Sequence, residues 1–193
     1  PIIVFDFDKI EAHNIGGQLF KTTDVAKTKV SAIYDLIHSF SGERIHTSEM
    51  PYDNNSMASA YMFSAFDNMK ARRDMFERWK SVFCNPELNT FNKNAIFIDG
   101  RLDAETFQIF SVRNNEEDLK NYEKNLFSDS EVENRSCTFK QTSHFAAMIA
   151  SYMVNIFTNH VSNIVNNNNA RKVPFYYEYV GMICFTNKNL NNE

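Results

Sequence analysis

Acidic and amide side chains cluster directly after an apolar run near the start of the sequence. The run IIVF leads into Asp6 and Asp8, and Asn14 and Gln18 follow on either side of a glycine pair. Side chains of these types can hold a ligand beyond the carboxyl end of a buried strand. They are equally suited to a polar turn. The segment is therefore either a ligand-binding turn or a turn that only ends the strand.

A second acidic position follows another apolar run. Asp67 and Asn68 come after the run SAYMF and directly before MKARRDMFERWKSVF, which has the pattern of a helix. Asp67 and Asn68 can cap this helix, and an acid again follows the end of a strand. Because ligands of α/β sheets bind beyond the carboxyl ends of strands, the two acidic positions are candidates for one site.

Apolar periodicity predicts the elements that position these residues. Strands are expected at IIVFDFD, RIHTSEM, SAYMFSAF, AIFIDGRL, ETFQIFSV and VPFYYEYVGMICF. Helices are expected from Asp24 to about Phe40 with Gly42 as the stop, at MKARRDMFERWKSVF, at EEDLKNYEKNLF, and from about Lys140 to Val165. Strands that alternate with helices predict an α/β fold with a mostly parallel sheet and flanking helices.

The composition fits a globular protein and argues against several partners. The chain of 193 residues is 43% hydrophobic and 23% charged, which suits one domain with its own core. A net charge of -4 argues against nucleic acid or an anionic membrane as the main partner. The longest apolar run, HFAAMIASYMVNIF, is shorter than the roughly 20 residues that cross a bilayer.

The cysteines favour a reducing compartment, and we therefore expect a cytoplasmic protein. Cys84, Cys137 and Cys184 are odd in number and form no C-x-x-C pair, so neither a zinc site nor a redox motif is expected. Cys84 and Cys184 have apolar neighbours in the sequence and are expected in the core.

Several segments together resemble one known family. The segment DFDKIEAHNIGGQLFKTTDVAKTK resembles D-x-D-x-V-x-x-x-N-x-x-R-Q, followed by an essential lysine, of the ThiF/MoeB/HesA superfamily of ubiquitin-activating-like adenylyltransferases. The segment AFDNMKAR resembles that family's D-N-x-x-x-R signature. FIDGRLDAETFQIF and RSCTFKQTSHFAAMIASYMVNIF are similar to its later strand pair and to its Cys-Thr segment with the closing helix. The segments run in family order across nearly the whole chain.

The resemblance implies a Rossmann-like activating-enzyme fold and a single adenylation domain over residues 1–193. It also implies a reaction in which the C-terminal carboxylate of a ubiquitin-like or sulfur-carrier protein attacks the α-phosphate of ATP and releases pyrophosphate. Such a transfer depends on positioning and charge neutralisation, so ATP and Mg²⁺ are the expected ligands.

The resemblance assigns nucleotide-binding roles to five residues of the N-terminal segment. Asp6 matches the acid that holds the ribose hydroxyls, and Asp8 is a candidate beside it. Asn14 and Gln18 match positions that face the nucleotide, although turn chemistry would also explain them. Lys29 matches the lysine that contacts the phosphates, and the alternative is one of several lysines on a solvated helix face.

Three residues are candidates for catalysis: Lys29, Asp67 and Cys137. Asp67 matches the family's Mg²⁺-binding aspartate, and Arg72 is expected to support the fold of the following helix. Cys137 falls where some relatives carry the thiol that takes over the activated modifier as a thioester, and where many bacterial relatives have a non-catalytic residue.

The sequence departs from the family pattern at two places. No first strand with a glycine-rich G-x-G-G-x-G turn precedes the first segment. We therefore expect an N-terminally incomplete domain, which is a truncated product, a chain completed by a partner, or a degenerate homologue. Gly17 occupies the position of the family's phosphate-contacting arginine, which predicts weaker stabilisation of the leaving pyrophosphate.

Three functions follow from these observations. The first is ATP-dependent adenylation, with a small ubiquitin-like or sulfur-carrier protein as partner and a homodimer or a complementing subunit as the assembly. The second is a catalytically inactive scaffold subunit of such an activating enzyme. The third is a nucleotide-binding protein of the Rossmann type with unrelated chemistry.

Overall fold

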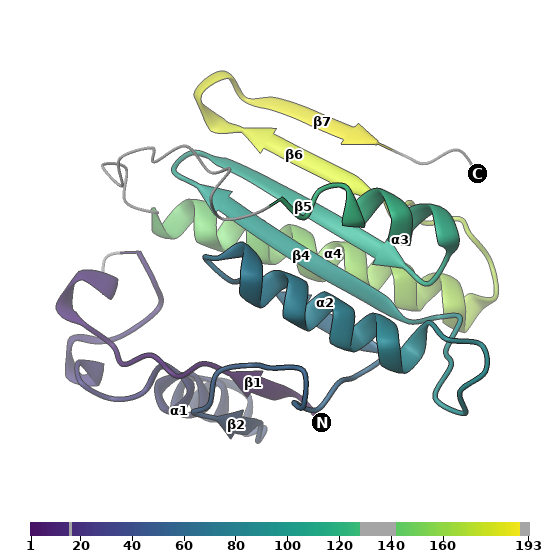
Figure 1. The fold of residues 1–193 in the computed structure, drawn as a ribbon. Coiled ribbons are helices and arrows are strands. Elements are labelled where there is room, and N and C mark those ends of the chain that lie inside the picture. Colours follow the sequence, from purple (N-terminus) through teal and green to yellow (C-terminus); the bar gives the residue numbers. More distant parts are fainter. Residues whose placement is uncertain (16, 128–141, 190–193) are drawn as a thin grey trace. The chain divides into compact units, whose positions relative to one another are not determined.

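The computed structural model describes residues 1–15, 17–127 and 142–189. The chain divides into two compact units, residues 1–52 and residues 53–193, and each is described by itself (Figure 1). The single domain expected from the sequence stays a prediction.

The first unit contains a β-α-β segment. β1 (Ile3–Phe5) pairs in parallel with β2 (His46–Ser48), and α1 (Lys29–Ser41) lies between them in the chain. α1 ends where predicted, at Gly42. The φ of 71° at Gly42 is the left-handed conformation that glycine adopts without strain.

The start of α1 differs from the prediction. We expected the helix to begin at Asp24, but Thr22–Asp24 forms a separate 3-10 turn, η2. Ala26 then has a φ of 73°, so an α-helix cannot run through this segment. Thr28 caps α1 by accepting a hydrogen bond from a backbone N–H of the first turn. Lys29 is consequently the first residue of the helix.

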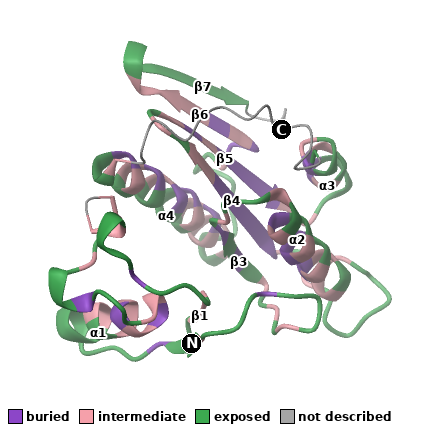
Figure 2. Cartoon of the chain, turned by 60° about the vertical axis from the view of Figure 1, so that its left-hand side comes forward, coloured by how far each residue is buried: buried purple, intermediate pink, exposed green. Residues whose placement is uncertain are grey.

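The second unit is a five-stranded sheet with helices on both faces. Its strand order is β3 (Tyr61–Ser64), β4 (Ile96–Asp103), β5 (Thr106–Arg113), β6 (Tyr176–Val180) and β7 (Phe185–Asn189). α2 (Met69–Phe83) and α3 (Glu116–Glu123) cover one face, and α4 (Ser143–Asn166) covers the other (Figures 1 and 2). The predicted α/β class with flanking helices is confirmed.

The sheets contain both parallel and antiparallel strand pairs. β1–β2 and β3–β4 pair in parallel, as predicted, and a helix joins the strands of each pair. Only Ala104 and Glu105 separate β4 from β5, which is too short for a crossover, so these strands form an antiparallel hairpin. β5–β6 and β6–β7 are antiparallel as well. Within residues 1–15, 17–127 and 142–189, parallel pairing is confined to β1–β2 and β3–β4.

The sheet separates the core of the second unit into two layers, one on each face. On the side of α2 and α3, aromatic rings pack with centres 4.7 to 6.0 Å apart. These rings belong to Phe76, Trp79, Phe97, Phe110 and Tyr122. The side of α4 holds an apolar cluster of Ile96, Ile98, Phe107, Ile109, Phe145, Ile149, Met153, Ile156 and Tyr177. β4 and β5 are buried along most of their length (Figure 2).

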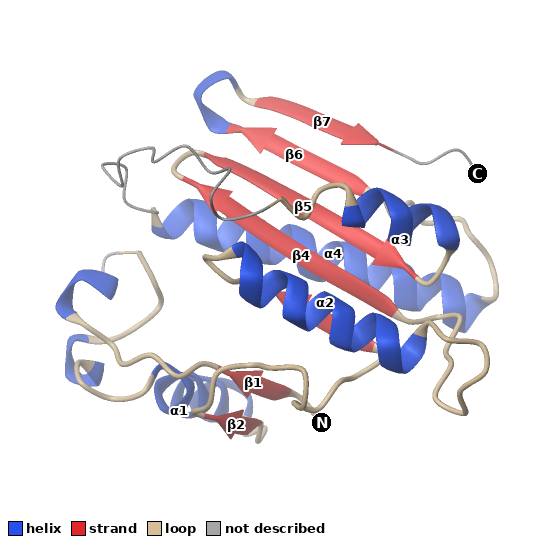
Figure 3. Cartoon of the chain, viewed as in Figure 1, coloured by secondary structure: helices blue, strands red, loops and turns tan. Residues whose placement is uncertain are grey.

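The last predicted strand is a hairpin in the structure. The segment VPFYYEYVGMICF is divided by a short helical turn, η4 (Gly181–Ile183), which connects β6 to β7 (Figure 3). A Cβ atom on Gly181 would lie 2.2 Å from the Phe145 ring, so the turn needs glycine here. Cys184 follows with a φ of 49° and is exposed, and its predicted place in the core is wrong.

Cys84 lies at the C-terminal end of α2 and is partly buried. Burial raises the pKa of its thiol to about 12, so this cysteine is not a nucleophile near neutral pH. Among the described residues, no helix combines the length and the hydropathy that a membrane crossing requires.

α4 carries a buried histidine. His160 is 8% exposed, and its Nε2 lies 2.8 Å from the carbonyl oxygen of Asn94. Burial lowers the pKa of His160 below its ordinary value of 6.5, because the imidazolium would lose hydration. The folded state therefore favours the neutral ring, whose Nε2–H donates to the Asn94 carbonyl.

We predict that the free energy of unfolding decreases as the pH falls below 6.5, and that His160→Gln removes part of this decrease. The unfolded chain takes up a proton near pH 6.5, whereas the folded chain does so only at lower pH. This contribution to stability is thus complete above pH 6.5 and is lost as the pH falls toward the folded-state pKa. Urea unfolding at pH values from about 7.5 to about 5 measures the slope. His144→Gln, at an exposed position of the same helix, is the control, and equal slopes in both variants would contradict the prediction.

Candidate functional site

Three of the predicted residues meet at the carboxyl end of β1. The Asp6 N–H donates to the Ser48 carbonyl at 3.1 Å, and the Asp6 carboxylate accepts the Asp8 N–H at 2.8 Å. The Lys29 N–H donates to the Asp8 carbonyl at 2.9 Å. The Lys29 ammonium lies 2.6 Å from Asp8 Oδ2 and 4.0 Å from Asp6 Oδ2. The structure therefore brings Asp6, Asp8 and Lys29 together.

Lys29 is held at this place and does not project from a solvated helix face. Its side chain is 16% exposed, against 43% for that of Lys27, which pairs with Asp24. The backbone around the site is also tied, because Ile10 exchanges hydrogen bonds of 2.9 Å with the Lys27 carbonyl and the Ala26 N–H. This geometry argues against the surface-lysine alternative.

Asn14 and Gln18 lie in the turn that follows. Asn14 ends the 3-10 turn η1 (Ala12–Asn14), and its side-chain oxygen accepts the Glu11 N–H at 2.8 Å. Its carbonyl accepts the N–H of Gly17 at 3.2 Å and that of Gln18 at 2.9 Å. The side-chain oxygen of Asn14 is therefore used in a turn, which is the alternative that the sequence left open. A contact of either amide group with a nucleotide stays a prediction.

Asp67 lies in the second unit, beyond the carboxyl end of β3. The helix cap is Asn68 and not Asp67, because the Asn68 side-chain oxygen accepts the Ala71 N–H at 2.8 Å. The Asn68 amide also donates to Asp67 Oδ1 at 3.1 Å. The Asp67 carboxylate is exposed. The structure thus argues against the capping alternative and leaves a hard oxygen ligand at the end of a strand.

A buried charge cluster that the sequence analysis missed adjoins the turn of Asp67. Asp99 in β4 is fully buried and accepts hydrogen bonds from Arg72, from Arg101 Nε at 2.8 Å and from the Tyr122 hydroxyl at 3.0 Å. Arg101 also stacks over Phe110, with its guanidinium carbon 4.4 Å from the ring centre. The signal in the sequence was an acid inside the otherwise apolar run AIFIDG.

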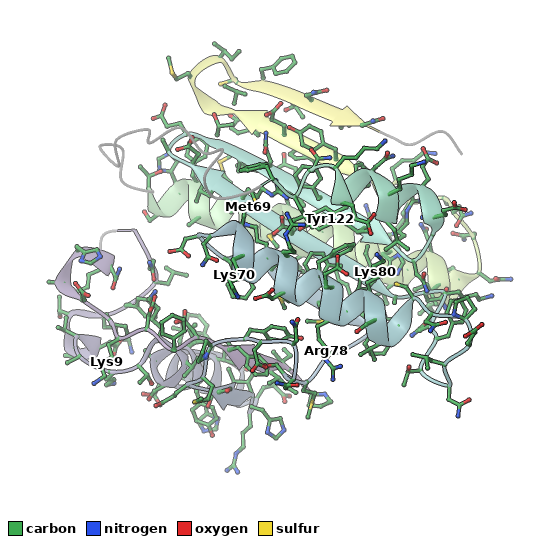
Figure 4. All side chains as sticks on the ribbon, viewed as in Figure 1. Lys9, Met69, Lys70, Arg78, Lys80 and Tyr122 are labelled. Atoms are coloured by element: carbon green, nitrogen blue, oxygen red, sulfur yellow. The ribbon has the colours of Figure 1, made fainter. Side chains whose placement is uncertain are left out.

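Tyr122 completes the cluster from α3. Its side chain lies between α3 and the sheet and is labelled in Figure 4. Burial, together with the nearby charge of Asp99, raises the pKa of Tyr122. The hydroxyl therefore stays protonated and donates to the carboxylate.

Cys137, the third candidate for catalysis, lies outside the described residues. Its proposed role is therefore not addressed by any contact in the structure.

The chain matches no protein-family model and no curated protein. Its fold does match solved structures. It is similar to selenomethionine PaaA with 17% identity and a TM-score of 0.60, over 96% of this chain and 63% of that chain. It is similar to E. coli MccB with ATP with 13% identity and a TM-score of 0.65, over 98% of this chain and 56% of that chain. MccB with AMPCPP and selenomethionine MccA matches with 13% identity and a TM-score of 0.58, over 100% of this chain and 57% of that chain.

At such identities these likenesses show the fold alone. The α/β fold with flanking helices that was expected from the sequence is shared with these structures. The chain spans between 56% and 63% of the length of these structures.

We predict that Asp99→Asn lowers the free energy of unfolding by about 3–5 kcal/mol, because the buried guanidinium of Arg72 and the partly buried one of Arg101 lose their counter-charge. Chemical denaturation measures the change. Asp103→Asn, at the exposed end of the same strand, is the control and is expected to change stability by less than about 0.5 kcal/mol. A loss of the same small size for Asp99→Asn would show that the carboxylate does not hold the cluster together.

Proposed function

We propose that this chain is an ATP-dependent adenylating domain that activates the C-terminal carboxylate of a peptide or a small carrier protein. The observation that carries the proposal is the Lys29 ammonium, which is fixed beside Asp6 and Asp8 at the end of a parallel strand. Further support comes from the fold shared with MccB, which has been crystallised with ATP and with MccA. A ubiquitin-like or sulfur-carrier protein is the proposed class of carrier.

In this proposal the N-terminal cluster binds the nucleotide. Asp6 accepts hydrogen bonds from the ribose hydroxyls, and Asp8 supports it. Lys29 places a positive charge at the phosphates, and Asn14 and Gln18 donate from their amide groups. The positive charge of Lys29 would stabilise the charge that develops on the leaving pyrophosphate.

Asp67 is the proposed ligand of Mg²⁺. Its exposed carboxylate is available because Asn68 serves as the helix cap. Mg²⁺ is commonly bound through one or two carboxylates, with substrate phosphates and waters completing its shell. The described residues contain no group of three or more metal-ligating side chains, and a site of this kind needs none. When bound, the ion neutralises charge on the transferred phosphate.

Cys137 is proposed to receive the activated carrier. Its thiolate attacks the carbonyl carbon of the adenylate, a thioester forms, and AMP leaves. Association as a homodimer or with a complementing subunit, and a cytoplasmic location, are further proposals.

An inactive scaffold subunit is the second candidate function. The observation that favours it is Gly17. This residue has no positive charge, whereas the family that the sequence resembles has an arginine at this position. The two candidates differ in a measurable way, because only the enzyme exchanges pyrophosphate into ATP.

We predict that Lys29→Ala lowers the rate of carrier-stimulated pyrophosphate exchange by about 100- to 1,000-fold, because one charge that stabilises the transition state is removed. Lys27→Ala is the control. It also removes one positive charge, but the Lys27 ammonium pairs with Asp24, so near-parental pyrophosphate exchange is expected. Exchange unchanged by Lys29→Ala would remove this lysine from the mechanism. A parent protein that neither binds ATP nor exchanges pyrophosphate would leave the scaffold as the function.

We predict that Asp67→Asn raises the Mg²⁺ concentration for half-maximal pyrophosphate exchange by at least about tenfold, because a charged oxygen ligand is lost. Titration of Mg²⁺ at saturating ATP measures it. Asp74→Asn changes a carboxylate that pairs with Lys70 on α2 and serves as the control. Equal Mg²⁺ requirements for both variants would argue that Asp67 does not bind the ion.

A further inference from the structure

Arg72 connects the turn that carries Asp67 to the buried carboxylate of Asp99. The Arg72 side chain is 7% exposed. Its Nη1 donates to Asp99 Oδ1 and, at 2.9 Å, to the carbonyl oxygen of Gly100. Its Nη2 donates to the carbonyl oxygen of Phe66. One guanidinium thus joins the turn after β3 to the middle of β4.

The bond to Phe66 fixes the backbone on the N-terminal side of Asp67. The Phe66 carbonyl and the Asp67 N–H belong to one planar peptide group, so an anchored carbonyl oxygen also orients the Asp67 N–H and Cα. On the other side, Asn68 is anchored by its hydrogen bond to the Ala71 N–H at 2.8 Å. Asp67 therefore lies between two fixed groups while its own carboxylate is exposed.

The far end of this connection is buried and hydrogen-bonded. Asp99 is fully buried and is held by Arg101 Nε at 2.8 Å and the Tyr122 hydroxyl at 3.0 Å. The Tyr122 ring packs against Phe97 and Phe110. Arg72 is consequently bonded to a carboxylate within the aromatic layer of the core.

We propose that Arg72 is a positioning residue, which fixes the turn of Asp67 so that this carboxylate meets the divalent cation of the reaction. The part that concerns the cation rests on the proposed function. A lysine cannot replace Arg72, because a single ammonium on a flexible stem does not span three acceptors on two segments as a planar guanidinium does.

The test compares Arg72→Lys with Arg73→Lys in the full-length protein. Arg73 is the matched control, since it follows Arg72 on α2 and donates to a different backbone carbonyl, that of Leu126, at 2.6 Å. Amide hydrogen exchange of a peptide covering residues 65–71 reports on the turn. The Mg²⁺ concentration for half-maximal pyrophosphate exchange reports on the carboxylate.

For Arg72→Lys we expect exchange over residues 65–71 to become about tenfold faster, since charge-assisted hydrogen bonds to the turn are lost. Exchange in β4 and β5 should stay near the parental rate. We also expect a higher Mg²⁺ requirement at a near-parental maximal rate. Arg73→Lys should change neither quantity.

A second variant, Tyr122→Phe, tests the proposal if Arg72→Lys does not fold. It keeps the aromatic ring and Arg72 but removes the hydroxyl that donates to Asp99. It should accelerate exchange over residues 65–71 in the same direction, by about threefold.

Two results would overturn the proposal. Parental exchange over residues 65–71 in Arg72→Lys would show that the arginine does not hold the turn. Equal acceleration throughout α2, β4 and β5 would show a general structural role only. If the parent protein has no Mg²⁺-dependent activity, the proposed function fails, and hydrogen exchange still decides whether Arg72 positions the turn.

Discussion

The buried carboxylate of Asp99 is the interaction on which the second unit depends. It receives hydrogen bonds from α2 through Arg72, from α3 through Tyr122, and from its own strand through Arg101. Uncompensated charge in a protein interior costs several kcal/mol, so these elements can pack on the sheet only when the donors converge on this acceptor. The surrounding aromatic rings keep water from the cluster and strengthen its electrostatics. The position of the turn after β3 follows from that convergence.

Local signals predicted much of this structure. The start of α2 was readable from Asn68, an amide directly before an amphipathic run, and the end of α1 from Gly42. The grouping of Asp6, Asp8 and Lys29 was predicted from the family resemblance, which placed all three at one nucleotide. The structure confirms these two helix boundaries and the grouping of the three side chains, while the nucleotide-binding roles of Asp6, Asp8 and Lys29 stay a prediction.

Other features depended on contacts that a sequence does not display. The alternating pattern of VPFYYEYVGMICF does not reveal the reversal of the chain. Gly181 is the one residue typical of turns at the point of reversal, and Cys184 adopts a left-handed conformation that cysteine rarely takes. The first turn of α1 was placed too early because Ala26 breaks the helix by its conformation and not by its residue type. The Asp99 cluster joins residues from three separate elements, and no local pattern pairs an acid in a strand with a particular arginine on a helix.

In the proposed function, the ion pair of Lys29 and Asp8 has a consequence for the order in which the phosphates and the ribose of the nucleotide bind. The ammonium already has an anionic partner, so an arriving phosphate exchanges one anion for another and the cation need not regain its hydration shell. Each carboxylate contact given up by Lys29 leaves an acceptor available for a sugar hydroxyl. Engagement of the triphosphate and engagement of the ribose are then thermodynamically linked, and each favours the other. A nucleoside without phosphates would instead meet carboxylates that are still in use.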